Sequence, residues 1–136
     1  MISDKEFMAI IGFHDPMYCG DERLFLEAHG YEVKENYDLD SLKSSIKTHP
    51  KADFYSMDIN LGKANTGFVE PAIEIYNLLK NRIDRDECKF YVLSANDDAL
   101  ENSVKAGIPK KHVVDKLMLG WSFEDMKNWV APLEKK

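Results

Sequence analysis

Apolar residues along this chain gather in short runs, and between the runs they recur every three or four positions. Short apolar runs are typical of buried strands, and the three-to-four spacing is typical of amphipathic helices. The first, third and fourth runs are almost continuously apolar, which indicates strands covered on both faces of a parallel sheet. The five predicted strands are 7–13, 31–36, 52–57, 89–94 and 112–115.

The segments after the strands predict five helices, at 17–30, 39–50, 68–83, 96–107 and 122–136. Gly30 and Gly107 end two of them, as suits the left-handed position that follows many helices. We expect buried helix faces to be formed by Leu24, Phe25 and Ala28, by Leu39, Leu42 and Ile46, by Ile75, Leu78, Leu79 and Ile83, and by Phe123, Met126, Trp129, Val130 and Leu133.

The repeated order of strand and helix requires parallel strands joined by crossovers, with helices on both faces of the sheet. The sequence therefore predicts an α/β fold, a doubly wound sheet of five parallel strands of the flavodoxin-like kind. A length of 136 residues suits one core, so we expect a single domain over 1–136. Such a domain would act by binding another protein, or would be one piece of a larger one.

Composition narrows the class of protein. The chain is 44% hydrophobic and 31% charged, as in ordinary globular proteins, and its net charge of -6 argues against a nucleic-acid surface. Cys19 and Cys88 have no zinc-site spacing, so we interpret them as buried or partly buried free thiols. No stretch approaches the length of a membrane span and the N-terminus lacks a basic signal region, so we expect a cytoplasmic protein.

Chemistry-bearing residues follow four of the predicted strands. In open α/β sheets, ligands bind at the carboxyl ends of the strands, near the point where strand order reverses. Asp58 ends a buried strand and needs a compensating partner there. It could share a divalent cation with Asp15, while Lys116 and Ser94 could hold an incoming oxyanion. The candidate residues at this edge are His14, Asp15, Asp58, Asn60, Ser94 and Lys116.

From Phe7 to Leu133 this arrangement resembles the receiver domain of two-component response regulators. The matching text is "MDINLG" around Asp58, "VLSAN" around Ser94, and "KAGIPKKHVVDK" leading to Lys116. "FLEAHGYEV" is similar to the family's first helix and second strand. The separations also agree, since Asp58 lies 44 residues after His14 and Lys116 lies 22 after Ser94.

The resemblance implies that Asp58 accepts a phosphoryl group from a histidine kinase, a phosphotransfer protein or a small phosphodonor. Asp15, Asp58 and the backbone carbonyl of Asn60 would hold magnesium, Lys116 would clamp the oxyanion, and Ser94 would move onto the phosphoryl group. The added charge would then switch an interaction face for a downstream protein. The chain would be a signalling domain in a phosphorelay, and not an enzyme beyond its own phosphorylation and dephosphorylation.

The family usually has two adjacent acids after the first strand, where this chain reads "GFHDP". If Asp15 and Pro16 align with the end of the family motif, Phe13 and His14 occupy the acidic pair and the main magnesium ligand is missing. A shift of one residue would instead let Asp15 serve as the ligand. Imidazole is a poor magnesium ligand, so the first alignment predicts weak magnesium binding or another metal. Val113 also replaces the family's usual switch aromatic.

Structural roles are an alternative for the same residues. Asp58 could cap a nearby backbone amide, Asp15 could be the N-cap of a helix starting near Pro16, and Ser94 and Lys116 could be a strand terminus and a surface amine. His14 would then be a partly buried, hydrogen-bonded side chain instead of a metal ligand. We expect the other histidines at the surface or at helix ends; they are His29, His49 and His112.

Two other functions remain open. The chain could be an atypical receiver that acts as a phosphorylation-independent interaction module, and the last helix could also form a homodimer. It could instead be a flavodoxin-like ligand-binding domain or a small hydrolase. The last function is less well supported, because the chain lacks a glycine-rich phosphate loop and the second acid of a D-x-D motif.

Overall fold

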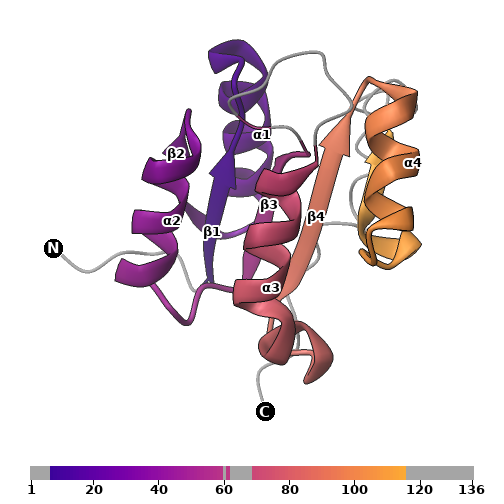
Figure 1. Cartoon of the computed structure of the whole chain (residues 1–136). Helices are drawn as coiled ribbons and strands as arrows, with labels where there is room; N and C mark the ends of the chain where they lie inside the picture. The colour runs from indigo at the N-terminus through magenta and orange to yellow at the C-terminus, as the bar shows by residue number, and fades with distance from the viewer. Residues whose placement is uncertain (1–6, 60, 62–68, 116–136) are drawn as a thin grey trace, which may run out of the picture.

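The computed structural model describes residues 7–59, 61 and 69–115. Within them, five parallel strands form one sheet in the order β2-β1-β3-β4-β5 (Figure 1). The strands are β1 (Phe7–Gly12), β2 (Tyr31–Asn36), β3 (Phe54–Asp58), β4 (Lys89–Ser94) and β5 (Val113–Asp115). The predicted doubly wound parallel sheet is confirmed.

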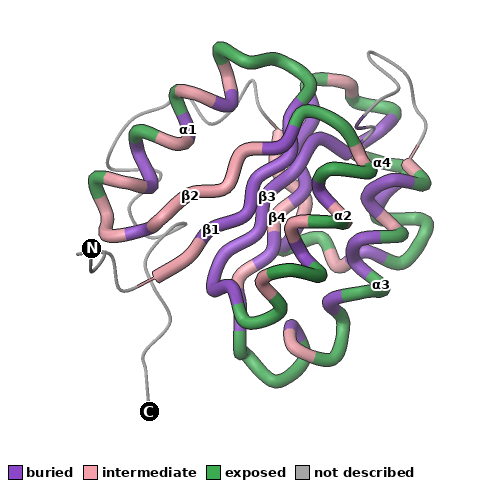
Figure 2. The backbone as a smooth tube through the Cα atoms, turned by 90° about the vertical axis from the view of Figure 1, so that its left-hand side faces the viewer, coloured by how far each residue is buried: buried purple, intermediate pink, exposed green. Residues whose placement is uncertain are grey.

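Helices cover both faces of this sheet. They are α1 (Pro16–Ala28), α2 (Leu39–Thr48), α3 (Glu70–Asp84) and α4 (Asp97–Lys105), and a 3-10 turn, η1 (Lys110–His112), precedes β5. Figure 2 shows the strands running between α1 on one side and α2, α3 and α4 on the other. The helix expected at 122–136 lies outside the described residues. Across the described part of the chain, none of the helices is both long enough and apolar enough to cross a membrane.

The alternation of side chains along β3 divides the core into two layers. Phe54 packs with the α1 cluster, whereas Tyr55 and Met57 pack with the cluster beneath α2 and α3. All five residues of β3 are buried, as the continuously apolar run predicted for a strand covered on both faces. Burying one large apolar side chain of this kind contributes about 1.5–3 kcal/mol.

The predicted helix ends are confirmed by backbone geometry. Gly30 and Gly107 follow α1 and α4 with φ of 91° and 112°, a conformation that side chains with a Cβ disfavour. Asp38 accepts a hydrogen bond from the Ser41 amide at 2.7 Å and so caps the start of α2. These polar caps satisfy amides that have no partner inside the helix.

Two predicted helix faces are partly wrong. Leu24 and Ala28 are exposed, and the buried stripe of α1 is formed by Cys19, Glu22, Phe25 and Leu26. On α3, Leu78 is 52% exposed although its neighbours along the predicted face are buried. In α1 the fully buried Glu22 lies on the buried stripe, where the apolar pattern did not predict a polar residue.

Both cysteines are buried free thiols, as predicted. Burial, with a contribution from the negative charges of Glu35 and Glu22, raises the pKa of Cys19 to about 12. Burial raises the pKa of Cys88 to about 11. Neither thiol is therefore a reactive thiolate at neutral pH.

A buried hydrogen bond fastens α1 to the centre of the sheet. Glu22 is fully buried, and its carboxylate accepts a hydrogen bond from the Ser56 hydroxyl of β3 at 2.6 Å. Residues two apart on a strand share a face, so Ser56 and Asp58 both face the α1 layer. A buried carboxylate is tolerated only where such donors hold it.

Replacing Ser56 tests this anchor. Ser56→Ala removes a donor from a buried carboxylate, so we expect the free energy of unfolding to fall by about 1–3 kcal/mol in urea at neutral pH. Ser44→Ala, at an exposed position of α2, is the matched control and is expected to change stability by less than about 0.5 kcal/mol. Equal stability of the two variants would contradict the assignment.

Candidate functional site

The order of the strands reverses between β1 and β3, which places their carboxyl ends side by side (Figure 1). Gly12 lies opposite Met57 in the register, so the residues after β1 emerge beside Asp58. This is the edge at which doubly wound sheets bind ligands. The candidate residues were predicted from the sequence to lie at this same edge.

Two backbone hydrogen bonds pin the chain as it leaves β1. The Phe13 amide donates to the Asn36 carbonyl oxygen on β2 at 3.0 Å. The His14 amide donates in the opposite direction, to the Asp58 Oδ2 on β3 at 2.8 Å. Asp58 is only 7% exposed, and this amide supplies part of the compensation that its carboxylate needs. The capping role considered for Asp58 is therefore present in the structure.

Asp15 begins α1. Its Oδ1 accepts a hydrogen bond from the Met17 amide at 2.9 Å, and Pro16 occupies the first turn of the helix. Asp15 is exposed, and the N-cap role considered for it is confirmed. The expectation that His14 is a partly buried side chain is wrong, because His14 is exposed and reaches Asp58 through its backbone amide.

An aromatic pair lies directly after β1 and at the start of α1. The Phe13 ring is fully buried and packs on Tyr18, with ring centroids 4.7 Å apart. Burial, together with the nearby negative charges of Glu22 and then Asp58, raises the pKa of the Tyr18 hydroxyl. Tyr18 is therefore neutral beside the carboxylates and adds no charge of its own.

Ser94 ends the neighbouring strand β4. It is 5% exposed, and its Oγ accepts a hydrogen bond from the Asn96 amide at 2.9 Å. Asn96 in turn caps α4 by accepting from the Ala99 amide at 3.1 Å. Ser94 thus holds the turn into α4, which is the strand-terminus role considered for it.

The remaining candidates lie at or beyond the limits of the described residues. Asn60 and Lys116 lie outside them. Ser94 pairs in register with Asp115, so β5 ends beside the site. Val113, which replaces the family's usual aromatic, is half-buried and packs against the core beneath α2 and α3.

The predicted magnesium site lies only in part within the described residues, because Asn60 is outside them. The Asp15 carboxylate is used to cap α1, and Phe13 offers no ligand atom. In the part of the chain that the structure describes, no three His, Cys, Asp or Glu side chains converge on a point where a metal ion could sit. Hard cations such as magnesium favour several oxygen ligands, so this donor set is poor for them. Magnesium binding stays a prediction.

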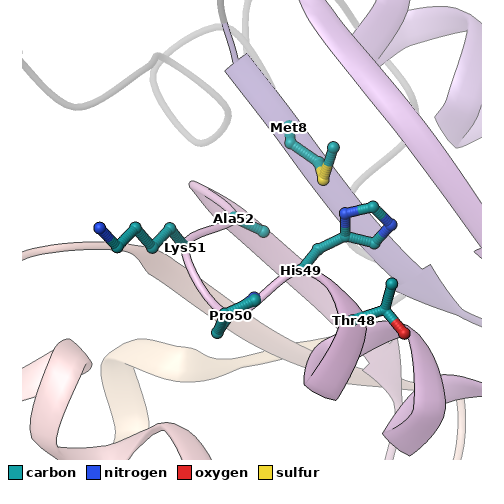
Figure 3. Close-up of a pocket in the computed structure, with 6 residues that line it drawn as sticks. All are labelled: Met8, Thr48, His49, Pro50, Lys51 and Ala52. Atoms are coloured by element: carbon teal, nitrogen blue, oxygen red, sulfur yellow. The ribbon is translucent and has the colours of Figure 1, made fainter.

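A pocket of about 330 Å³ lies at the opposite ends of the strands, between the end of α2 and the start of β1. Figure 3 shows the residues that line it. The His49 imidazole points toward Met8, whereas the Lys51 side chain extends away. The lining is mostly apolar and brings together no group of acids or nucleophiles, so the Asp58 edge remains the candidate functional site.

The role of Asp15 can be tested by two substitutions. Asp15→Ala removes the N-cap and is expected to lower the free energy of unfolding by about 0.5–2 kcal/mol, whereas Asp15→Asn keeps a capping oxygen and most of the stability. The measurement is urea unfolding with and without magnesium. Asp38→Ala, at the equivalent cap of α2, should match Asp15→Ala. A loss seen only in the presence of magnesium would show instead that Asp15 is a metal ligand.

Comparison with protein families and with curated proteins found no match. Solved structures do match. A response regulator receiver domain protein from Clostridium thermocellum aligns with a TM-score of 0.66 at 14% identity, over 91% of this chain and 90% of that one. The two-component response regulator RcsB, solved with DNA, aligns with a TM-score of 0.63 at 16% identity, over 91% of this chain and 59% of that one. The chain has the fold of response regulator receiver domains.

Proposed function

We propose that this chain is an atypical receiver that binds another protein without magnesium-dependent phosphorylation of Asp58. One observation carries the proposal: the backbone amide of His14 holds the Asp58 carboxylate at 2.8 Å, beside a buried Phe13. The receiver fold supports a role in signalling. The function follows from the residues of the site, because a fold alone does not determine function.

Charge at the site disfavours phosphoryl transfer. A phosphoryl donor brings negative charge to the Asp58 carboxylate, and catalysis requires fixed positive charge to stabilise it. Glu22 adds a second carboxylate in the layer beneath α1, and Phe13 stands where an acid would help to hold a cation. One donor to Asp58 is the neutral amide of His14. A second carboxylate and a buried ring at these two places offer a transferring phosphoryl group less stabilisation than an acidic pair with a bound cation would.

The hydrogen bond also gives Asp58 a structural task. It joins the end of β3 to the segment after β1, and that segment leads directly to the N-cap of α1. A carboxylate whose lone pair is engaged by an amide is stabilised and becomes a weaker nucleophile. An aspartate at this position therefore has a structural role that does not require phosphorylation.

The surface next to the site is suited to contact with a protein. On α1, Met17 is 79% exposed and Leu24 is 60% exposed, and the two lie two turns apart on one face of the helix. Exposed large apolar side chains on one face are a feature of interaction surfaces. Met17 lies two residues after Asp15, which caps α1, and three after His14, whose amide contacts Asp58.

Phosphorylation of Asp58 by a histidine kinase, with Ser94 and Lys116 assisting, is the second candidate. The register of β3 and β4 favours this candidate. Asp58 pairs with Leu93, and the next residue along β4 is Ser94, which ends the strand. A hydroxyl one residue beyond the partner of Asp58 is in a suitable place to approach a phosphoryl group. The two candidates differ in their dependence on magnesium.

Beryllofluoride with millimolar magnesium, monitored through backbone amide NMR shifts, separates the two candidates. We expect no change at the amides of His14, Asp58 and Ser94 in the natural chain. His14→Asp restores an acid where the family has one, at an exposed position, and is expected to gain a response. Shifts in the natural chain that vanish in Asp58→Asn would contradict the proposal and establish the phosphorylated receiver.

A further inference from the structure

One histidine is buried far from the Asp58 edge, at a helix end, which is one of the two places expected for it. His112 ends η1, directly before β5, and is 9% exposed. Its Nδ1 lies 2.9 Å from the Phe90 carbonyl oxygen. A carbonyl oxygen only accepts, so Nδ1 carries the proton and the neutral ring leaves a lone pair on Nε2. Among the described residues, Nε2 is buried without a hydrogen-bond partner.

The surroundings of His112 are largely aromatic. The rings of Tyr76 on α3, Phe90 on β4 and Tyr91 on β4 have centroids 6.4, 6.0 and 6.5 Å from the imidazole. A cavity of about 290 Å³ borders the same place. Charged and titratable groups from each described element packed there surround the imidazole. They are Tyr76 and Asp84 of α3, Asp86 and Cys88 of the following loop, Lys89 and Tyr91 of β4, and Lys111 of η1.

These surroundings favour the neutral imidazole. Burial lowers the pKa of His112 below its ordinary value of 6.5; the bond to Phe90 and the charge of Asp84 oppose this shift, and the charge of Lys111 adds to it. A proton on Nε2 would place a charged N–H among aromatic rings with no acceptor in the described structure. Burying an unpaired charge is strongly unfavourable, so protonation favours any state in which the ring reaches water.

The strand that follows His112 is the shortest of the described strands. Within the described residues, which end at Asp115, β5 spans three residues and pairs with β4 alone, from Val113 opposite Val92 to Asp115 opposite Ser94. At the other edge, β2 pairs with β1 over six residues. Short edge segments open at lower free energy than long ones, so β5 is the strand that the loss of one anchoring contact releases first.

We propose that His112 is a pH-sensitive latch that holds β5 on β4 while the imidazole is neutral and releases β5 when Nε2 is protonated. The latch is independent of the function proposed for the Asp58 site. Because the folded-state pKa is lowered, the closed state is fully stable above about pH 6.5. Its stability then falls as the pH drops through 6.5 toward the lower folded-state pKa, since the open state binds the proton more tightly.

The test uses the full 136-residue chain and two NMR measurements between pH 7.5 and 5. The first is titration of the His112 ring. The second is hydrogen-exchange protection of the Val113, Val114 and Asp115 amides, corrected for intrinsic exchange rates, with Val33 and Lys34 of β2 as the reference. We expect β5 to lose protection about tenfold or more, with a midpoint that matches the His112 titration and lies below 6.5, while β2 keeps its protection.

His112→Asn is the matched variant, because its side-chain amide keeps a donor toward Phe90 and removes the titratable Nε2. We expect β5 to stay protected in it across the same pH range. His29 makes a similar bond, with Nδ1 2.9 Å from the Phe25 carbonyl oxygen, but it is half-buried on α1, so His29→Phe should leave the acid response of β5 unchanged.

Several results would overturn the latch. These are an equal loss of β5 protection in His112→Asn, no loss in the natural chain, or a loss shared equally by β2. If His112→Asn does not fold, the natural chain still decides, because a His112 midpoint that differs from the midpoint for loss of β5 protection would also exclude the proposal.

Discussion

Pairing of β1 with β2 on one side and β3 on the other is the constraint on which the candidate site depends. It brings two segments 44 residues apart into contact, where the His14 amide meets the Asp58 carboxylate at 2.8 Å. The Phe13 amide bonds to β2 one residue earlier, and Asp15 caps α1 one residue later. Three consecutive residues are thereby fixed in orientation, with Phe13 buried, the His14 amide on Asp58, and Asp15 turned to the helix.

This geometry bears on the chemical role of Asp58 at the end of β3. In a phosphoacceptor site the carboxylate must attack, and cations must take up the charge that arrives. Here the same carboxylate accepts a hydrogen bond that joins two strand ends, from the backbone amide of His14, and the residue before His14 is the fully buried Phe13. The structure therefore shows a receiver fold in which the Asp58 carboxylate accepts an amide hydrogen bond from the segment that connects β1 to α1.

The sequence predicted the fold well because the fold depends on repeating patterns. Continuous apolar runs and three-to-four spacing depend on which faces are buried, and Gly30 marks the end of α1 by its positive φ. The pattern did not reveal polar contacts inside the core. Glu22 lies on the buried stripe of α1 and accepts a hydrogen bond from Ser56 across the core, and the burial of His112 depends on the Phe90 carbonyl, a backbone group that no sequence pattern displays.

The candidate site was predicted in part. Sequence order placed Asp15, Asp58 and Ser94 at one edge, since parallel strands end together. It left the alignment of "GFHDP" open, because a shift by one residue changes which side chain faces the site without changing the pattern. In the structure Asp15 caps α1 and His14 contributes its amide to Asp58, and neither hydrogen bond chooses between the two alignments. Lys116 and Asn60 lie outside the described residues, so their roles remain predictions.

The most direct test of the central interaction is a long-range HNCO experiment that detects scalar coupling across hydrogen bonds. The structure predicts a cross peak between the His14 amide nitrogen and the Asp58 side-chain carboxyl carbon, unchanged when millimolar magnesium is added. Absence of that cross peak, or its loss on adding magnesium, would contradict the account, because it would show that the Asp58 carboxylate is free to bind a cation.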